Sequence, residues 1–168
     1  GLGIPVDLSL AFHTDAGVSP DDSIIGTLAI YTLKCEDSEV LPNGESRLQA
    51  RSYADFVQTQ IVEDIRSTCN PKWNRRGLWD RSYSESRTTT GPALLVGLLS
   101  HQNFADMKFG LDPSFRFLVS RAIYKGVLKY LSARYGCPYE VQPLPVNSFR
   151  TMFDTKPSEK GKTGVTLS

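Results

Sequence analysis

Two histidines stand where strand-like apolar runs end, and they are the first residues to consider for chemistry. His13 follows "VDLSLAF" (residues 6–12), and His101 lies in a polar run that follows "PALLVGLL" (92–99). In open α/β sheets the ligands gather outside the carboxyl ends of the strands, so we expect both histidines at one rim of a sheet. Neutral imidazole is the commonest protein ligand for zinc, which makes His13 a candidate metal ligand. The pattern is equally consistent with a histidine that only hydrogen-bonds a loop.

Other catalytic arrangements have less support in the sequence. A catalytic zinc needs three protein ligands and an open position for water, and no HExxH motif occurs. The carboxylates closest to the predicted strand ends are Asp15 and, in a following loop, Glu85; by pattern alone both are typical of solvated or turn residues. Ser100 beside His101 is not a triad, because neighbours at a strand end point in different directions. GxSxG, GxGxxG and P-loop motifs are absent.

The elements that must position these residues alternate between strand and helix. Residues 23–33 predict a second strand with a bulge at Gly26, and 92–99 predict a strand buried on both faces. Residues 45–67 have the apolar spacing of an amphipathic helix, which ends before Pro71. A further helix is expected from Asp112-Pro113-Ser114 to about Gly136. This alternation predicts an α/β fold.

Two segments lack regular patterns. Residues 70–91 are polar and contain Trp73, Trp79 and Tyr83 among arginines, which indicates a functional loop or cover. These aromatic rings could stack on sugar or peptide, or they could pack onto the core. Residues 139–168 are rich in proline and end in the alternation "GVTL", which indicates a linker and the opening strand of another domain.

Composition bounds the function. A chain of 168 residues, 40% of them hydrophobic, suits one globular domain. The net charge is +1, and the basic residues are spread along the chain instead of being concentrated on one segment, so nothing favours nucleic-acid binding. No apolar run reaches the roughly 18 residues that span a bilayer. Cys35, Cys69 and Cys137 lack metal-ligand spacing; a Cys69–Cys137 disulfide is possible, but three isolated cysteines are favoured. The chain begins without methionine or a basic region, so no signal peptide is expected within it.

Two stretches carry a family resemblance: "VDLSLAFHTDAG", and "PALLVGLLSHQNFADMKFGLDPSFRFLVSRAIYKGVLKYL". Residues 4–135 resemble the C-terminal two-thirds of the zinc-dependent N-acetylmuramoyl-L-alanine amidase catalytic domain (the amidase_3 family). The similar form is that of multidomain Bacteroidetes proteins, some of which carry a xanthan lyase label. The resemblance implies a mixed, mostly parallel sheet flanked by helices in a three-layer α/β/α arrangement. It assigns residues 1–138 to this domain, truncated at its N-terminus.

The resemblance also implies a chemistry. In that family a zinc ion bound by two histidines and a glutamate activates water, which attacks the amide between N-acetylmuramic acid and L-alanine, and a further glutamate acts as base. His13 matches the second zinc histidine, and the other ligands would lie upstream of Gly1. The catalytic glutamate is expected at position 97, where this chain has Gly97. His101 and Glu85 are the candidates to replace it. Loss of a general base costs on the order of 10²- to 10⁴-fold in rate, and the 168 residues alone are expected to be inactive.

Further expectations follow from the same resemblance. Candidate substrate-binding residues are Asp15, Ser100, Asn103, Trp79 and Arg87. The implied partner is peptidoglycan or a related glycopeptide. The implied location is outside the cytoplasm, in the periplasm or cell envelope. The tail from about Pro143 resembles the entry into a fibronectin type III-like module. The alternative is a catalytically inactive cell-wall or polysaccharide-binding module that uses Trp73, Trp79 and Tyr83. A polysaccharide lyase of the xanthan type is a remote alternative.

Overall fold

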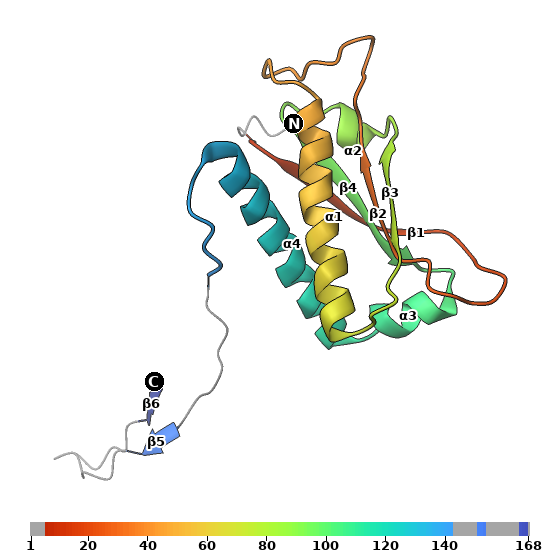
Figure 1. Cartoon of the computed structure of the whole chain (residues 1–168), viewed down its shortest axis with the longest axis vertical. Coiled ribbons are helices and arrows are strands. Elements are labelled where there is room, and N and C mark those ends of the chain that lie inside the picture. The colour runs from red at the N-terminus through yellow and green to blue at the C-terminus, as the bar shows by residue number, and fades with distance from the viewer. Residues whose placement is uncertain (1–5, 143–150, 154–164, 168) are drawn as a thin grey trace.

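A four-stranded mixed sheet organises the chain in the computed structural model, which describes residues 6–142, 151–153 and 165–167 (Figure 1). The strands lie in the order β1-β4-β2-β3. Their bounds are Ser9–Asp15 for β1, Ala93–Ser100 for β4, Thr27–Tyr31 for β2 and Arg75–Asp80 for β3. β1 pairs with β4 in parallel, β2 pairs with β3 in parallel, and β2 and β4 are antiparallel. The prediction of a mixed, mostly parallel sheet flanked by helices is confirmed.

The centre of the sheet explains the longest apolar run. β4 lies between β1 and β2, and all eight of its residues are buried. A strand with neighbours on both sides and covered faces has no position for a solvated side chain, so its sequence is continuously apolar rather than alternating. The strand predicted over 92–99 is therefore confirmed.

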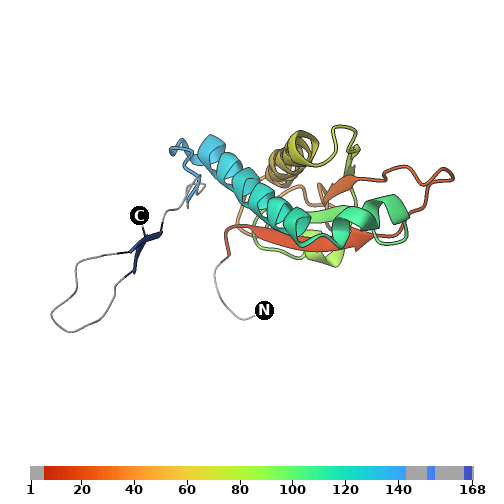
Figure 2. The ribbon, with the colours of Figure 1, turned by 90° about the horizontal axis from the view of Figure 1, so that it is seen from below.

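Two long helices cover one face of the sheet (Figure 2). They are α1, Leu48–Thr68, and α4, Pro113–Tyr135. α4 begins where the sequence predicts, because the Asp112 side chain accepts a hydrogen bond from the Ser114 backbone N–H at 2.8 Å. It ends at Gly136, whose φ of 65° is the left-handed conformation that glycine adopts readily. The expected helix ends are thus confirmed.

The polar segment 70–91 is more ordered than predicted. It contains the edge strand β3 and a short helix, α2, Ser84–Arg87, which packs against the opposite face of the sheet. The prediction of an irregular loop was wrong because an edge strand pairs on one side only and can carry exposed arginines without an apolar alternation. Trp73 is fully buried and donates its indole N–H to the Thr27 hydroxyl at 2.9 Å, so it cannot stack on a ligand.

Two boundaries also differ from expectation. β1 extends to Asp15 instead of ending at residue 12, so His13 lies within the strand. Gly26 precedes β2 and is not a bulge inside it. Its φ is 81°, and a Cβ there would lie 2.1 Å from the Asn74 carbonyl oxygen, so only glycine fits this position.

The C-terminal segment contributes two short strands, β5, Thr151–Phe153, and β6, Val165–Leu167, which pair antiparallel. Most of the predicted linker and fibronectin type III-like module lies outside the described residues and stays a prediction. Cys35, Cys69 and Cys137 are free thiols. Among the described residues no helix is both long and apolar enough to cross a membrane.

Candidate functional site

A cleft of ≈ 280 Å³ lies on the sheet face that carries α2. Adjacent strands form its floor: His13 on β1 pairs in register with Gly97 on β4, and Asp15 lies two residues beyond His13. Apolar side chains from β2 and β4 complete the floor, and Tyr83 and Glu85 form the wall. We call this the His13 cleft. Its lining residues are His13, Thr14, Asp15, Leu28, Ile30, Tyr83, Glu85, Leu95 and Gly97.

His13 and Glu85 face each other although they are far apart in sequence. The His13 Nε2 and Glu85 Oε1 atoms are 3.7 Å apart, and their side chains are 44% and 41% exposed. That distance is long for a hydrogen bond but within the range of an ion pair when the imidazole is protonated. Hydrogen bonds from the Glu85 backbone N–H and the Ser84 hydroxyl, with a smaller contribution from His13, lower the pKa of the Glu85 carboxyl below its usual range. Glu85 is therefore ionised at neutral pH and is a weaker base than an ordinary glutamate.

Position 97 has room for a side chain. A Cβ built on Gly97 would lie 3.5 Å from the Leu28 Cβ and 3.7 Å from the Asp15 Cβ, which are ordinary van der Waals contacts. The backbone conformation does not demand glycine here, in contrast to Gly26. A Cβ is therefore sterically accommodated at this position, so glycine here is a feature of the sequence and not a requirement of the fold.

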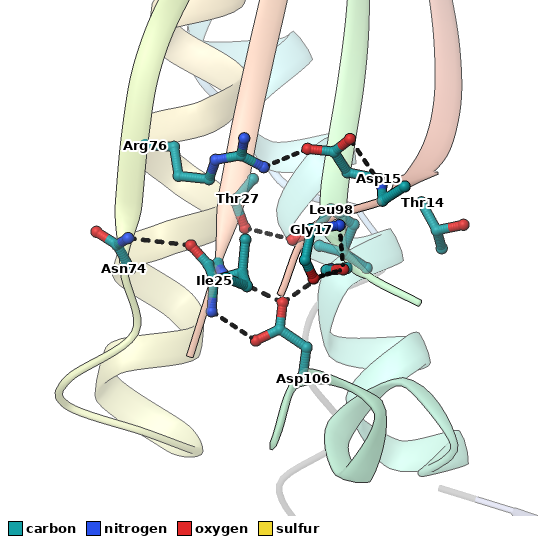
Figure 3. A network of polar contacts seen from close by, with 12 residues as sticks. Thr14, Asp15, Gly17, Ile25, Thr27, Asn74, Arg76, Leu98 and Asp106 are labelled. Atoms are coloured by element: carbon teal, nitrogen blue, oxygen red, sulfur yellow. Dashed lines mark hydrogen bonds and ion pairs between the residues drawn. The ribbon is translucent and has the colours of Figure 1, made fainter. Parts of the chain in front are cut away.

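The carboxylate beside Gly97 is already paired. Asp15 on β1 forms an ion pair with Arg76 on β3, so this contact passes over the two central strands (Figure 3). Asp15 also accepts a hydrogen bond from the Ala16 backbone N–H at 2.8 Å. Arg76 in turn lies 5.2 Å from the ring centre of Trp79. The ion pair and the backbone hydrogen bond hold Asp15 in place, which suits it to positioning a ligand.

Ser100 and Asn103 lie in an internal network and not in the His13 cleft. The Ser100 hydroxyl oxygen accepts a hydrogen bond from the Gly17 backbone N–H at 2.9 Å. Asn103 caps α3, Phe104–Gly110, by accepting from the Asp106 N–H, and it donates to the Ser23 carbonyl. Both side chains are buried and hold the loop that joins β1 to β2.

Asp106 is the centre of this network and was missed by sequence reasoning. Its buried carboxylate accepts hydrogen bonds from the backbone N–H groups of Ile25, Gly26 and Ser100 at 2.9, 3.2 and 2.8 Å (Figure 3). These contacts join the loop before β2 to the end of β4. The available signal was Asn103 followed three residues later by an acidic residue, a helix N-terminal pattern.

The other predicted residues lie around the His13 cleft rather than in it. His101 is exposed at the same rim as His13, where its Nδ1 lies 3.2 Å from the Thr14 hydroxyl and its backbone N–H donates to the Asp15 carbonyl. The rim expected for both histidines is therefore present, but His101 does not line the cleft. Trp79 is partly exposed on β3 between Arg76 and Arg81. Arg87, at the far end of α2, lines a different hollow.

The described residues do not form a complete zinc site. Residues 6–142 and the two short C-terminal strands contain no group of three histidine, cysteine or acidic side chains able to hold a metal ion. His13 and Glu85 supply two of the donor types that zinc prefers, and a structural or catalytic site requires at least three protein ligands. The ligand role of His13 stays a prediction, and no reaction step through zinc follows from these side chains.

Comparison with known proteins identifies the fold. No family model matches the chain, and no curated protein matches it by sequence. Solved structures do: an N-acetylmuramoyl-L-alanine amidase from Clostridium difficile 630 aligns with a TM-score of 0.59 and 20% identity over 76% of this chain and 59% of that chain. The CwlD amidase from Clostridioides difficile, solved with the GerS lipoprotein, aligns with 0.58 and 17% over 78% and 57%. The Mycobacterium smegmatis N-acetylmuramyl-L-alanine amidase aligns with 0.58 and 18% over 75% and 54%.

The chain thus spans between 54% and 59% of the length of these three structures. Identities of 17% to 20% establish a common fold and leave the activity of this chain to be argued from its own residues. Together with its mixed sheet, its strand order and its covering helices, these alignments show that the chain has the α/β fold of the N-acetylmuramoyl-L-alanine amidases.

Proposed function

We propose that this chain is part of a peptidoglycan-directed domain, and that its His13 cleft binds the junction between N-acetylmuramic acid and L-alanine. The observation that carries the proposal is the gathering of His13, Glu85 and Asp15 at one cleft of an amidase-type sheet. The amide at this junction is the bond by which the structural neighbours are named. The domain would then act at the cell envelope, where peptidoglycan lies.

The chemistry of the cleft suits a glycopeptide. Its floor combines the apolar side chains of β2 and β4 with His13 and Asp15, its wall holds the half-exposed ring of Tyr83, and its polar groups converge on one space. A peptide amide can donate to the Glu85 carboxylate and accept from a ring N–H of His13. The sugar ring can pack against Tyr83, because aromatic faces bind the apolar faces of sugars. The cleft therefore combines the two kinds of contact that a muramyl peptide needs.

Turnover is expected to be slow without a base at position 97. Gly97 has no proton-transfer group, Asp15 is paired with Arg76, and the pKa of Glu85 is lowered. A positioned general base contributes about 10²- to 10⁴-fold to a rate. Binding is thus the activity that the described residues support best, and zinc-dependent hydrolysis of the amide is the second candidate, because position 97 lines the cleft and has room for a Cβ.

One experiment on the full-length protein distinguishes binding from hydrolysis. Binding is measured by co-sedimentation with purified insoluble peptidoglycan, and hydrolysis by release of stem peptides with and without a zinc chelator. We expect the unmodified protein to bind and His13→Ala to bind more weakly. Gly97→Glu is expected to raise release by at least about 10²-fold, and the chelator to abolish that gain.

Gly97→Gln is the matched control, because it has nearly the same size and lacks the carboxylate. Equal rates in the Gln and Glu variants would show that position 97 does not hold the base. Failure of the unmodified protein to sediment with peptidoglycan would overturn the binding function.

A further inference from the structure

A second and larger hollow lies at the other end of α2. It has a volume of ≈ 740 Å³ and is enclosed by the loop that follows β2, the beginning of α1 and the residues that flank α2. Figure 1 shows this loop and α2 at the end of the sheet away from α3. We call it the Arg47 hollow, after the side chain in its wall. It shares no lining residue with the His13 cleft.

Arg47 is buried and incompletely paired. The residue is 4% exposed, and its Nη2 donates to the Arg87 carbonyl at 3.1 Å. Its Nε and Nη1 atoms are buried with no hydrogen-bond acceptor among the described residues, and no carboxylate of that part of the chain forms an ion pair with it. A buried guanidinium is always charged, and burying it without a counter-charge is unfavourable. Arg47 therefore has two buried donors for which the described residues supply no acceptor.

The rest of the hollow strengthens the case for a negative partner. Lys34 and Arg87 also line it, and Glu36 is its single acidic lining residue. Lys34 forms an ion pair with the exposed Asp37 at 3.1 Å, so the charge of Lys34 is partly compensated, whereas no such partner is found for Arg47 among the described residues. Counting Asp37, the three cations face two carboxylates, which leaves one excess positive charge at a concave surface and attracts anions.

We propose that the Arg47 hollow binds an oxyanion, either a carboxylate or a phosphate group. Guanidinium groups form strong charge-assisted hydrogen bonds with both. A rotation about the Arg47 side-chain torsions would turn its free donors toward the anion, while Lys34 and Arg87 neutralise the remaining charge. The site needs nothing from His13, so it stands independently of the proposed glycopeptide function.

The test is calorimetric titration of the full-length protein. One arm uses inorganic phosphate, and the other uses N-acetylalanine against its uncharged amide. We expect binding of at least one anion, no binding of the amide, and an affinity about 10- to 100-fold weaker in Arg47→Met. A preference for phosphate points to a phosphorylated polymer as the source, and a preference for N-acetylalanine points to a peptide carboxylate.

Arg51→Met is the matched control, because Arg51 lies one turn further along the same helix and is exposed. It should leave the affinity unchanged. Thermal unfolding distinguishes loss of binding from loss of folding. In the absence of anion, Arg47→Met should be at least as stable as the unmodified protein. Adding anion should raise the melting temperature of the unmodified protein but not that of Arg47→Met. The proposal is overturned if neither anion binds, if the amide binds equally well, or if both methionine variants lose affinity equally.

Discussion

Replacing Asp106 by asparagine should loosen the loop that leads into β2. The Asp106 Oδ1 atom accepts from the Ile25 N–H, and Oδ2 accepts from the Gly26 and Ser100 N–H groups. Asparagine retains only one oxygen. Its best orientation places that oxygen at the Oδ2 position and turns the NH₂ group toward the Ile25 N–H, so that two donors face each other in a buried site.

The magnitude follows from these contacts. The variant loses one charge-assisted hydrogen bond, weakens two others and leaves a buried donor unsatisfied, which together should cost about 2–4 kcal/mol in the free energy of unfolding. The backbone conformation of the loop should change most at Ile25 and Gly26, because their N–H groups donate to Asp106. The effect is thus both global, in stability, and local, in the protection of two backbone amides.

The assays are urea unfolding followed by circular dichroism and amide hydrogen exchange of the full-length protein. Asp22→Asn is the matched control: the exposed Asp22 side chain accepts from the Phe104 and Ala105 N–H groups, and asparagine keeps an acceptor there. That control should change stability by less than about 0.5 kcal/mol. A loss below about 1 kcal/mol in Asp106→Asn, or unchanged exchange at Ile25, would refute the reasoning.

Two further predictions concern a tight helix contact and a buried phenol. A Cβ at Gly126 would lie 2.7 Å from the Val57 Cα, so Gly126→Ala should push α4 away from α1 and lower the free energy of unfolding by about 1–3 kcal/mol. Gly97→Ala, where a Cβ has room, should be neutral or slightly stabilising. The denaturant midpoints of the two variants check this contrast. Burial raises the pKa of Tyr53 to about 12. Because the folded state holds this proton more tightly than the unfolded state, the contribution of Tyr53 to stability is complete below pH 10 and is lost as the pH rises toward 12. Tyr53→Phe should reduce the decline in unfolding free energy over that interval, and equal declines in both proteins would contradict the assignment.

Local patterns were reliable where one local interaction decides the structure. The ends of α4 were predictable because a side-chain cap at Asp112 and a left-handed glycine at Gly136 act within a few residues. The buried strand β4 was predictable because its apolar run is continuous. β3 was not, since its stability comes from pairing with β2, a partner more than forty residues earlier in the chain. The burial of Trp73 has the same origin, because its hydrogen-bond partner is Thr27 on β2.

The same distinction between local pattern and long-range packing applies to the candidate site. The sequence by itself predicted a strand leading to His13 and determined that position 97 lacks a carboxylate, since both depend on residue type and local pattern. Pairing with β4 extends that strand through His13 to Asp15. Only the tertiary structure decided that Glu85 faces His13, that Arg76 holds Asp15 across two strands, and that Arg47 is buried without an acceptor. These facts depend on strand order and on the placement of α2. Long-range packing sets both, and no spacing along the chain encodes them directly.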